Sequence, residues 1–244
     1  MPDIRCGPRL RGSIRWEIVR RAGGGTRLLA RLDARDAAAF GGLVARVSNN
    51  VEQRLAPGVI ANRCAVSQRQ SMLAPWGPAW GTWRASIRTA IDDGAWTHVA
   101  VTDVRDCYGS IRPDVVERSL ERAGARAADA MAVGAYLRSL EQSGVRGLPV
   151  GPDPSAVLAN VVLTELDDAA VEAGCAFVRW VDDLVVFAPA AAAARAALDD
   201  IGRAADRTGL RLHPGKTRTF SDRHEARSIL LRRRASGGGS ACMA

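Results

Sequence analysis

Residues 177–187 read FVRWVDDLVVF, two apolar runs on either side of the acidic pair Asp182-Asp183. A two-residue connection between runs of strand-forming residues predicts a β-hairpin. Such turns usually carry Asn-Gly or two glycines, because the chain needs positive φ angles there. Two adjacent carboxylates instead repel each other, which raises the pKa of one of them unless a cation lies between them and a third group. The pair therefore indicates either a solvated acidic turn or one part of a cation site.

A second apolar run, HVAVTD at residues 98–103, also ends in an acidic residue, and the aromatic Tyr108 follows it. If Asp103 lies beside the predicted hairpin turn, three carboxylates share one edge of a sheet. Such a set can hold two divalent cations about 3.5–4 Å apart, the arrangement that drives in-line nucleotidyl transfer. Oxygen ligands of this kind suit Mg²⁺. For this segment alone, a core strand that ends in a polar turn is the alternative.

Three segments resemble, in order and spacing, the palm motifs of reverse transcriptases and, more broadly, of right-hand polymerases. Residues 102–111, TDVRDCYGSI, are similar to the first motif, and residues 147–160, GLPVGPDPSAVLAN, to the motif that supports the template and the incoming nucleotide. Residues 180–183, WVDD, resemble the aromatic-x-Asp-Asp hairpin, with Trp180 where tyrosine or phenylalanine is usual. The resemblance covers about residues 60–220. It implies an α+β fold, a polymerase palm in which helices back an antiparallel sheet.

The middle motif differs from the form found in viral and intron enzymes, since Val150 stands where glutamine is common. Its Leu-Pro-Val-Gly-Pro form, residues 148–152, is more similar to bacterial antiviral (abortive-infection type) reverse transcriptases, which implies a role in antiphage defence. Pro149 and Gly151 belong to this motif and are expected to contact the substrate, because a glycine-containing loop lets the backbone approach the template closely.

Lys216 is the only lysine in the chain, and the other 33 basic residues are arginines. A lysine kept against this bias can serve where arginine cannot, because an ammonium can give up a proton and a guanidinium cannot. Residues 210–217, LRLHPGKT, resemble the family's fourth palm motif, whose lysine lies near the leaving pyrophosphate. The alternative is a lysine that persists by chance in a loop.

The resemblance also implies roles for the other site residues. Asp103 and Asp182 would bind two Mg²⁺ ions, for which Mn²⁺ can substitute, and Asp183 would be a weaker or outer ligand. Tyr108 would stack beneath the sugar and exclude a 2′-hydroxyl, so that it selects DNA synthesis. The alternative for Tyr108 is a buried aromatic residue of the core.

The region in front of the first motif matches the family less well, and the fingers are expected to be reduced. Arg63 and Arg69 are the candidates for gripping phosphates in this region. Three tryptophans follow at helical spacing, Trp76, Trp80 and Trp83. They could stack on bases, but packing of a helix against the palm is the favoured interpretation.

The chain divides by composition and pattern into four parts. Residues 1–35 hold nine arginines against three acidic residues and are expected to form a basic N-terminal arm, either mobile and in contact with nucleic acid or simply solvated. Residues 36–97 are expected to be a helical, fingers-like region, residues 98–235 the palm, and residues 236–244 a flexible Gly/Ser tail. Helices are predicted at about residues 36–55, 82–92, 113–123, 127–143, 154–173 and 190–208.

No thumb is recognisable, because only 28 residues follow Lys216 and a helical thumb needs several tens. Either the product is short, a protein or RNA partner replaces the thumb, or the reading frame is truncated.

Composition limits the remaining possibilities. Hydrophobic residues make up 47% of the 244 residues, which excludes a disordered chain. No apolar run reaches the roughly 18 residues of a membrane span, and the amino terminus has no secretory leader. The five scattered cysteines fit free thiols in a reducing compartment, so a cytoplasmic protein without a membrane partner is expected. The net charge of +8 favours a polyanionic partner.

The sequence therefore predicts an RNA-directed DNA polymerase that adds dNTPs to the 3′-hydroxyl of a DNA or RNA primer on an RNA template. An RNA-directed RNA polymerase or a template-independent terminal transferase on the same palm remains open. A nucleotide cyclase is disfavoured, because residues 147–160 and Lys216 have no role there. The last alternative is a catalytically impaired palm that acts as a nucleic-acid-binding module.

Overall fold

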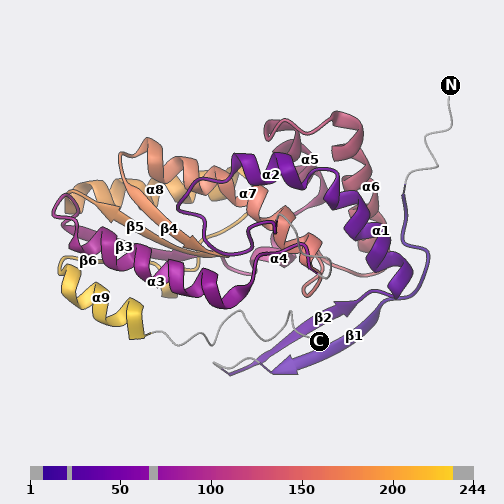
Figure 1. Cartoon of the computed structure of the whole chain (residues 1–244), viewed down its shortest axis with the longest axis horizontal. Helices are drawn as coiled ribbons and strands as arrows, with labels where there is room; N and C mark the ends of the chain where they lie inside the picture. Colours follow the sequence, from indigo (N-terminus) through magenta and orange to yellow (C-terminus); the bar gives the residue numbers. More distant parts are fainter. Residues whose placement is uncertain (1–7, 21–23, 66–70, 233–244) are drawn as a thin grey trace.

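A computed structural model describes residues 8–20, 24–65 and 71–232. Its centre is a four-stranded antiparallel sheet in the order β4-β5-β3-β6. The strands are β3 (His98–Asp103), β4 (Ala176–Trp180), β5 (Asp183–Ala188) and β6 (Arg218–Phe220). Both faces of this sheet are covered by helices (Figure 1). The chain is thus an α+β protein, as its sequence predicts.

Alternating residues of each strand enter two different cores, because side chains along a strand point to opposite faces. Ala100, Leu184 and Val186 pack with the helices α7 (Asp153–Glu172) and α8 (Ala191–Arg207). Val101 and Val185 pack on the other face with α3 (Trp76–Asp92) and α9 (Arg223–Arg232). Burial on both faces explains why the strands read as continuous apolar runs.

The remaining helices form a layer beside α7. They are α1 (Ala34–Ala45), α2 (Ser48–Arg54), the short α4 (Cys107–Ser110), α5 (Pro113–Arg122) and α6 (Ala127–Gln142). The turn between α5 and α6 uses Gly124, whose φ of 81° is readily adopted by glycine. Helix α7 runs through the middle of the molecule and is buried along most of its length (Figure 1).

Two helices differ from their predicted bounds. The helix expected at residues 36–55 is divided into α1 and α2, because the chain turns at Arg46 and Val47 and places the Val47 side chain in the core. Helix α3 begins at Trp76, earlier than the expected residue 82. Gly77 and Pro78 are poor helix formers, so the sequence pattern did not indicate a helix there, although proline is tolerated in a first turn.

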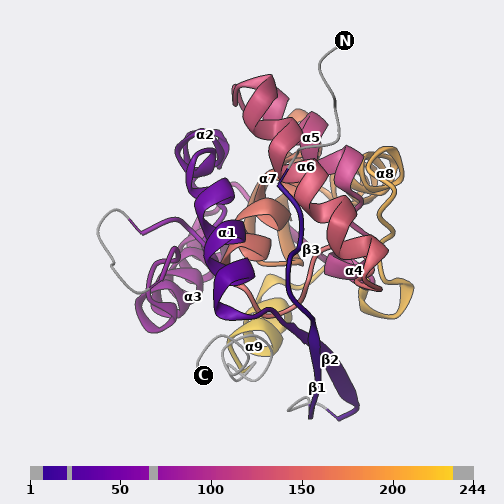
Figure 2. The same ribbon diagram turned by 90° about the vertical axis from the view of Figure 1, so that its right-hand side faces the viewer.

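Residues 1–35 contain a β-hairpin that the sequence analysis did not predict. Strands β1 (Arg15–Arg20) and β2 (Thr26–Arg31) pair antiparallel and project from the rest of the molecule (Figures 1 and 2). The segment before the hairpin is anchored by backbone hydrogen bonds. Leu10 N donates to Ser139 Oγ, and Arg11 N and Gly12 N donate to the Asp36 carboxylate.

The part of the chain that the structure describes ends with α9, which packs on the sheet beside α3. No separate helical bundle follows the sheet within residues 8–232. The expected Gly/Ser tail, residues 236–244, lies outside the described residues. Among the helices of the described ranges, none has both the length and the hydropathy that crossing a membrane requires.

Candidate active site

Three carboxylates meet at one end of the central sheet. Asp103 is the last residue of β3, and its Cα partner across the ladder is Asp183, the first residue of β5. Asp182 lies in the turn that precedes Asp183, and its carbonyl oxygen accepts a hydrogen bond of 3.3 Å from Val104 N. Directly opposite residues on antiparallel strands point to the same face. Antiparallel pairing therefore brings together two segments that are far apart in the sequence.

The turn between β4 and β5 consists of Val181 and Asp182, because Trp180 pairs with Asp183. The acidic pair therefore does not form the turn by itself, as the sequence had suggested; Asp183 already belongs to the strand. Val181 has a φ of 55°, a conformation that is unusual for a β-branched residue. The positive φ expected at this turn is thus present, but at valine rather than at an aspartate.

Lys216 lies beside Asp103. Its Nζ atom is 2.7 Å from Asp103 Oδ2, and the Lys216 side chain is half-exposed while that of Asp103 is buried. The 3-10 helix η1 (Pro214–Lys216) that carries the lysine is held to β3, since His213 N donates to the Asp103 carbonyl oxygen at 2.7 Å. The hydroxyl groups of Thr102 and Thr217 also form a hydrogen bond, of 2.8 Å.

The carboxylates influence one another electrostatically. Burial, together with the negative charges of Asp103 and Asp183, raises the pKa of Asp182 to about 7, while Lys216 acts in the opposite direction. Neighbouring Cys107 is buried, and its thiol pKa is raised well above its usual value by that burial and next by the charge of Asp182. The end of the sheet therefore concentrates negative charge, with Asp103 buried and Asp182 and Asp183 partly exposed.

Two of the predicted motifs are joined behind the carboxylates. Leu148 N donates to the Tyr108 carbonyl oxygen at 2.8 Å, so that the loop after α6 lies against α4. Gly147 has a φ of 66°, and a Cβ atom there would overlap the same carbonyl oxygen. Only glycine fits this position. Tyr108 is half-buried and packs against the main core, consistent with both interpretations of this residue.

A sequence model of the family "Reverse transcriptase (RNA-dependent DNA polymerase)" matches residues 48–230, which is more than half of the chain. The chain belongs to the reverse transcriptase family. The match includes every segment that forms the end of the sheet described above, from the first motif to the lysine loop. No curated protein matches the chain significantly.

The loop of the middle motif carries Pro149 and Gly151, the two residues that the sequence analysis expected to contact the substrate. Pro149 is buried and Gly151 is partly exposed, with a φ of 124° that strongly favours glycine. The loop continues into α7, where Asp153 accepts hydrogen bonds from Ser71 Oγ at 2.6 Å and Met72 N at 3.1 Å. The loop at residues 147–152 and α7 are thereby attached to the segment that leads into α3.

Arg63, a predicted phosphate contact, is engaged with protein groups instead. Its Nε donates to Glu52 Oε1 at 2.6 Å, and its Nη1 donates to the carbonyl oxygens of Ala56 and Val59. These contacts hold the loop after α2 in place. The Arg63 guanidinium therefore serves this loop and does not join the carboxylates at the end of the sheet. Arg69, the second predicted phosphate contact, lies outside the described residues.

The tryptophans of α3 pack on the β4–β5 hairpin. This confirms the interpretation, favoured from their helical spacing, that they pack a helix against the palm. Trp180 meets the rings of Trp76, Trp80 and Trp83 edge-on, at centroid distances of 6.0, 5.0 and 6.3 Å. Trp83 and Trp180 are buried, and Trp76 is partly exposed at the edge of the cluster. The unusual tryptophan of the WVDD segment thus anchors α3 to the palm.

Sequence reasoning missed the buried residues that support the carboxylate turn. Arg179 is 1% exposed and forms an ion pair with Asp167 of α7. The sequence did contain an indication of this ion pair, because Arg179 lies within the apolar run FVRWV and a buried arginine needs an acidic partner. The sequence offered several acidic residues as that partner, and only the packing of β4 on α7 selects Asp167.

Proposed function

We propose that this member of the reverse transcriptase family is an RNA-directed DNA polymerase that adds deoxynucleotides to a primer 3′-hydroxyl. The observation that carries the proposal is the convergence of Asp103, Asp182, Asp183 and Lys216 at one end of the sheet. The family match and the net charge of +8 support nucleic acid and nucleotides as its ligands. The template would be RNA, and the primer DNA or RNA.

Reverse transcriptases use divalent cations, and the donor chemistry of this site fits such ions. Oxygen ligands suit Mg²⁺, and the raised pKa of Asp182 reflects its burial and then its repulsion by Asp103 and Asp183, which a cation would relieve. We propose two Mg²⁺ ions, replaceable by Mn²⁺, held by Asp103 and Asp182 with Asp183 as an outer ligand. When bound, such ions activate the attacking hydroxyl and neutralise the triphosphate.

The side chains do not stand in a ready-made metal cluster. Within the described ranges, no group of three acidic, histidine or cysteine side chains is arranged to hold an ion. Lys216 Nζ lies on the Asp103 oxygen that would serve as a ligand. Since the Lys216 side chain is half-exposed, it can turn away from Asp103 toward bound phosphates. Withdrawal of Lys216 is therefore part of the proposal.

Lys216 would then act on the leaving group. Its ammonium would donate a proton to the departing pyrophosphate oxygen as the bond to the α-phosphorus breaks. Tyr108 would lie beneath the sugar of the incoming nucleotide, where it leaves no space for a 2′-hydroxyl. Both roles follow from matching these residues to the family's motifs.

A role in antiphage defence is supported by the Leu-Pro-Val-Gly-Pro form of residues 148–152. With no thumb-like bundle in residues 8–232, a protein or RNA partner would hold the template and primer.

Primer extension on an RNA template with dNTPs and Mg²⁺ tests the function. Asp103→Asn and Asp182→Asn should each abolish incorporation, because each removes a charged ligand, and Asp183→Asn should be milder. Circular dichroism should show that the variants remain folded. Near-normal incorporation by both of the first two variants would contradict the proposed site.

The second candidate is a nucleic-acid-binding module without turnover, favoured by the Lys216–Asp103 ion pair, which occupies an oxygen that a cation would need. The same assay separates the two functions. Binding of a labelled primer–template without extension, under any divalent cation, would support the second candidate.

A further inference from the structure

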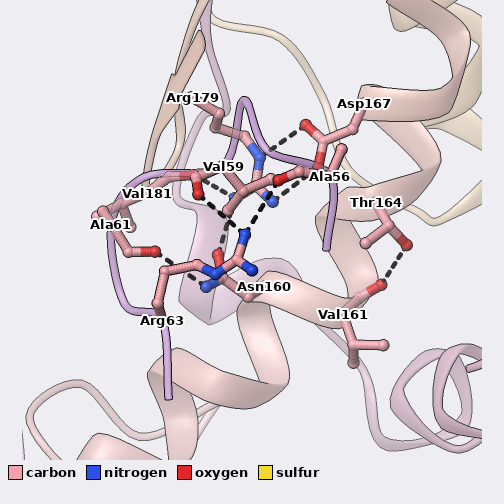
Figure 3. A network of polar contacts seen from close by, with 10 residues as sticks. All are labelled: Ala56, Val59, Ala61, Arg63, Asn160, Val161, Thr164, Asp167, Arg179 and Val181. Atoms are coloured by element: carbon pink, nitrogen blue, oxygen red, sulfur yellow. Dashed lines mark hydrogen bonds and ion pairs between the residues drawn. The ribbon is translucent and has the colours of Figure 1, made fainter. Parts of the chain in front are cut away.

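Arg179 is a fully buried arginine whose contacts reach in three directions (Figure 3). It lies on β4, and its side chain crosses toward α7. Its Nε and Nη2 atoms donate to the two oxygens of Asp167 at 2.7 and 2.8 Å, a bidentate contact between buried partners. A buried ion pair loses much of its Coulombic energy to desolvation, so stability alone explains it poorly. Its remaining contacts are therefore informative.

The third nitrogen, Nη1, is shared between the main chain and α7. It donates to the Val181 carbonyl oxygen at 2.8 Å and to Asn160 Oδ1 at 2.9 Å (Figure 3). The Val181 carbonyl belongs to the peptide group that joins Val181 to Asp182. Arg179 consequently fixes the orientation of the peptide plane from which Asp182 departs.

This peptide follows a strained residue. Val181 has a φ of 55°, and a β-branched residue in that region persists only where its surroundings enforce it. The hydrogen bond from Arg179 to the Val181 carbonyl is an enforcing contact of this kind. Without it, valine would favour a negative φ, and the turn would carry Asp182 to a different position.

The same network extends to residues 58–62, which lie within the fingers-like region. Asn160 Nδ2 donates to the carbonyl oxygen of Ala61 at 3.1 Å (Figure 3) and to that of Asn62 at 3.0 Å. The main chain of Arg179 is also bound to this segment, since its N–H donates to Gly58 O and its carbonyl accepts from Ile60 N. Residues 58–62 are thereby joined to β4 and to the turn.

We propose that Arg179, held by Asp167 and Asn160, is a positioning residue that sets the Val181–Asp182 turn and connects it to residues 58–62. The inference rests on the proposed function in that Asp182 is taken as a cation ligand. Arginine is needed because only its planar fork of five donors can serve Asp167, Asn160 and Val181 together. Lysine would keep the charge and lose that geometry.

The first test compares Arg179→Lys with Arg54→Lys. Arg54 of α2 forms an ion pair with Asp168, the neighbour of Asp167, which makes it a matched control. Mn²⁺ binding, followed by loss of the free-ion electron paramagnetic resonance signal, should weaken about tenfold or more in Arg179→Lys, the usual effect of removing a group that orients a metal ligand. It should stay unchanged in Arg54→Lys. Equal Mn²⁺ affinity of a folded Arg179→Lys variant and the wild type would overturn the inference.

The second test is a rescue. Glycine adopts positive φ without a penalty, so Val181→Gly should restore most of the Mn²⁺ affinity lost in Arg179→Lys, while it changes the wild-type background little. A general structural defect would not be rescued in this way. If the double variant binds Mn²⁺ no better than Arg179→Lys alone, the role assigned to the turn is wrong.

A third variant tests the proposal without leaving a buried charge unpaired, which could unfold the protein. Replacing both partners, Arg179→Met with Asp167→Leu, leaves no unpaired buried charge, and such exchanges are often neutral for stability. This variant should keep the wild-type melting temperature and still bind Mn²⁺ about tenfold more weakly. Wild-type affinity in this variant would also refute the proposal. If the wild type binds Mn²⁺ but extends no primer, the proposed polymerase function fails while the positioning role stands.

Discussion

Asp182 is the residue at which burial and charge oppose each other most clearly. Its pKa is raised to about 7, first by burial and then by Asp103 and Asp183. An unfolded aspartate has a pKa near 3.9, so the folded protein binds more protons than the unfolded one between about pH 4 and pH 7. Folding is therefore favoured at the acidic side of this range, and the contribution is lost as the pH rises through it.

We expect the metal-free protein to lose stability as the pH rises from about 4 to 7. Asp182→Asn should remove part of that dependence and raise the melting temperature at pH 8, because an amide carries no charge to desolvate. Thermal unfolding at several pH values, with a chelator present, measures this. Parallel pH profiles for the variant and the wild type would show that Asp182 is not the responsible group.

Lys216 can be tested without changing its charge. If it donates a proton to the leaving pyrophosphate, Lys216→Arg should keep nucleotide affinity but slow the chemical step by roughly 10²–10⁴-fold, the usual range for a general acid. Lys216→Ala should lose both. Single-turnover incorporation separates binding from chemistry. A full rate in the arginine variant would leave Lys216 a role in charge alone.

Tyr108 should control the choice of sugar. Removal of its ring in Tyr108→Ala should open the space that a 2′-hydroxyl would occupy, so incorporation of ribonucleotides should rise relative to deoxynucleotides. Competition between dNTP and rNTP substrates gives the ratio directly. Unchanged discrimination would assign Tyr108 to the core, against which its side chain packs.

Among the elements, the β1–β2 hairpin is the one whose position suggests contact with a partner. One of its faces carries the exposed apolar side chains Trp16 and Ile18 opposite Leu28 on the neighbouring strand. Arg20 follows on the same face, since it is two residues from Ile18. Apolar and aromatic groups next to arginine suit the bases and phosphates of a single strand.

We expect Trp16→Ala to weaken binding of single-stranded RNA, because stacking on an aromatic ring contributes about 1–3 kcal/mol per base. Fluorescence anisotropy with a labelled oligonucleotide measures the affinity. Met131→Ala, which removes an exposed apolar side chain from α6, is the control and should have no effect. Equal affinity of both variants would mean that the hairpin does not bind RNA.

At the scale of the whole molecule, the two faces of the sheet differ in what they support. One face supports the carboxylates together with the apolar layer of α3 and α9. The other face rests on α7, which supplies Asp167 and Asn160 to the network behind the turn. Helix α7 also begins directly after the loop at residues 147–152, so one buried helix connects this loop to the turn. A rigid support of this kind suits a site that must hold repelling charges close together.

Much of this arrangement was accessible from the sequence alone. Helical periodicity predicted α5, α6, α7 and α8 to within about two residues at each end, because amphipathic spacing is a local property. The α+β class and the family followed from three ordered motifs. The assignment of the carboxylates as site residues also came from those motifs, and that of Lys216 came from a fourth motif at residues 210–217. Their catalytic roles stay predictions.

Other features were decided only by the tertiary structure, because they depend on contacts between residues far apart in the chain. Strand pairing placed Val181 rather than Asp183 in the turn, and packing of β4 on α7 selected Asp167 as the partner of Arg179. The predicted phosphate contact Arg63 was engaged by Glu52, which the sequence could not foresee. Residue type and periodicity determined which elements form and which side chains carry chemistry. Long-range packing determined how those side chains meet, since the energy of a buried charge depends on its neighbours in space.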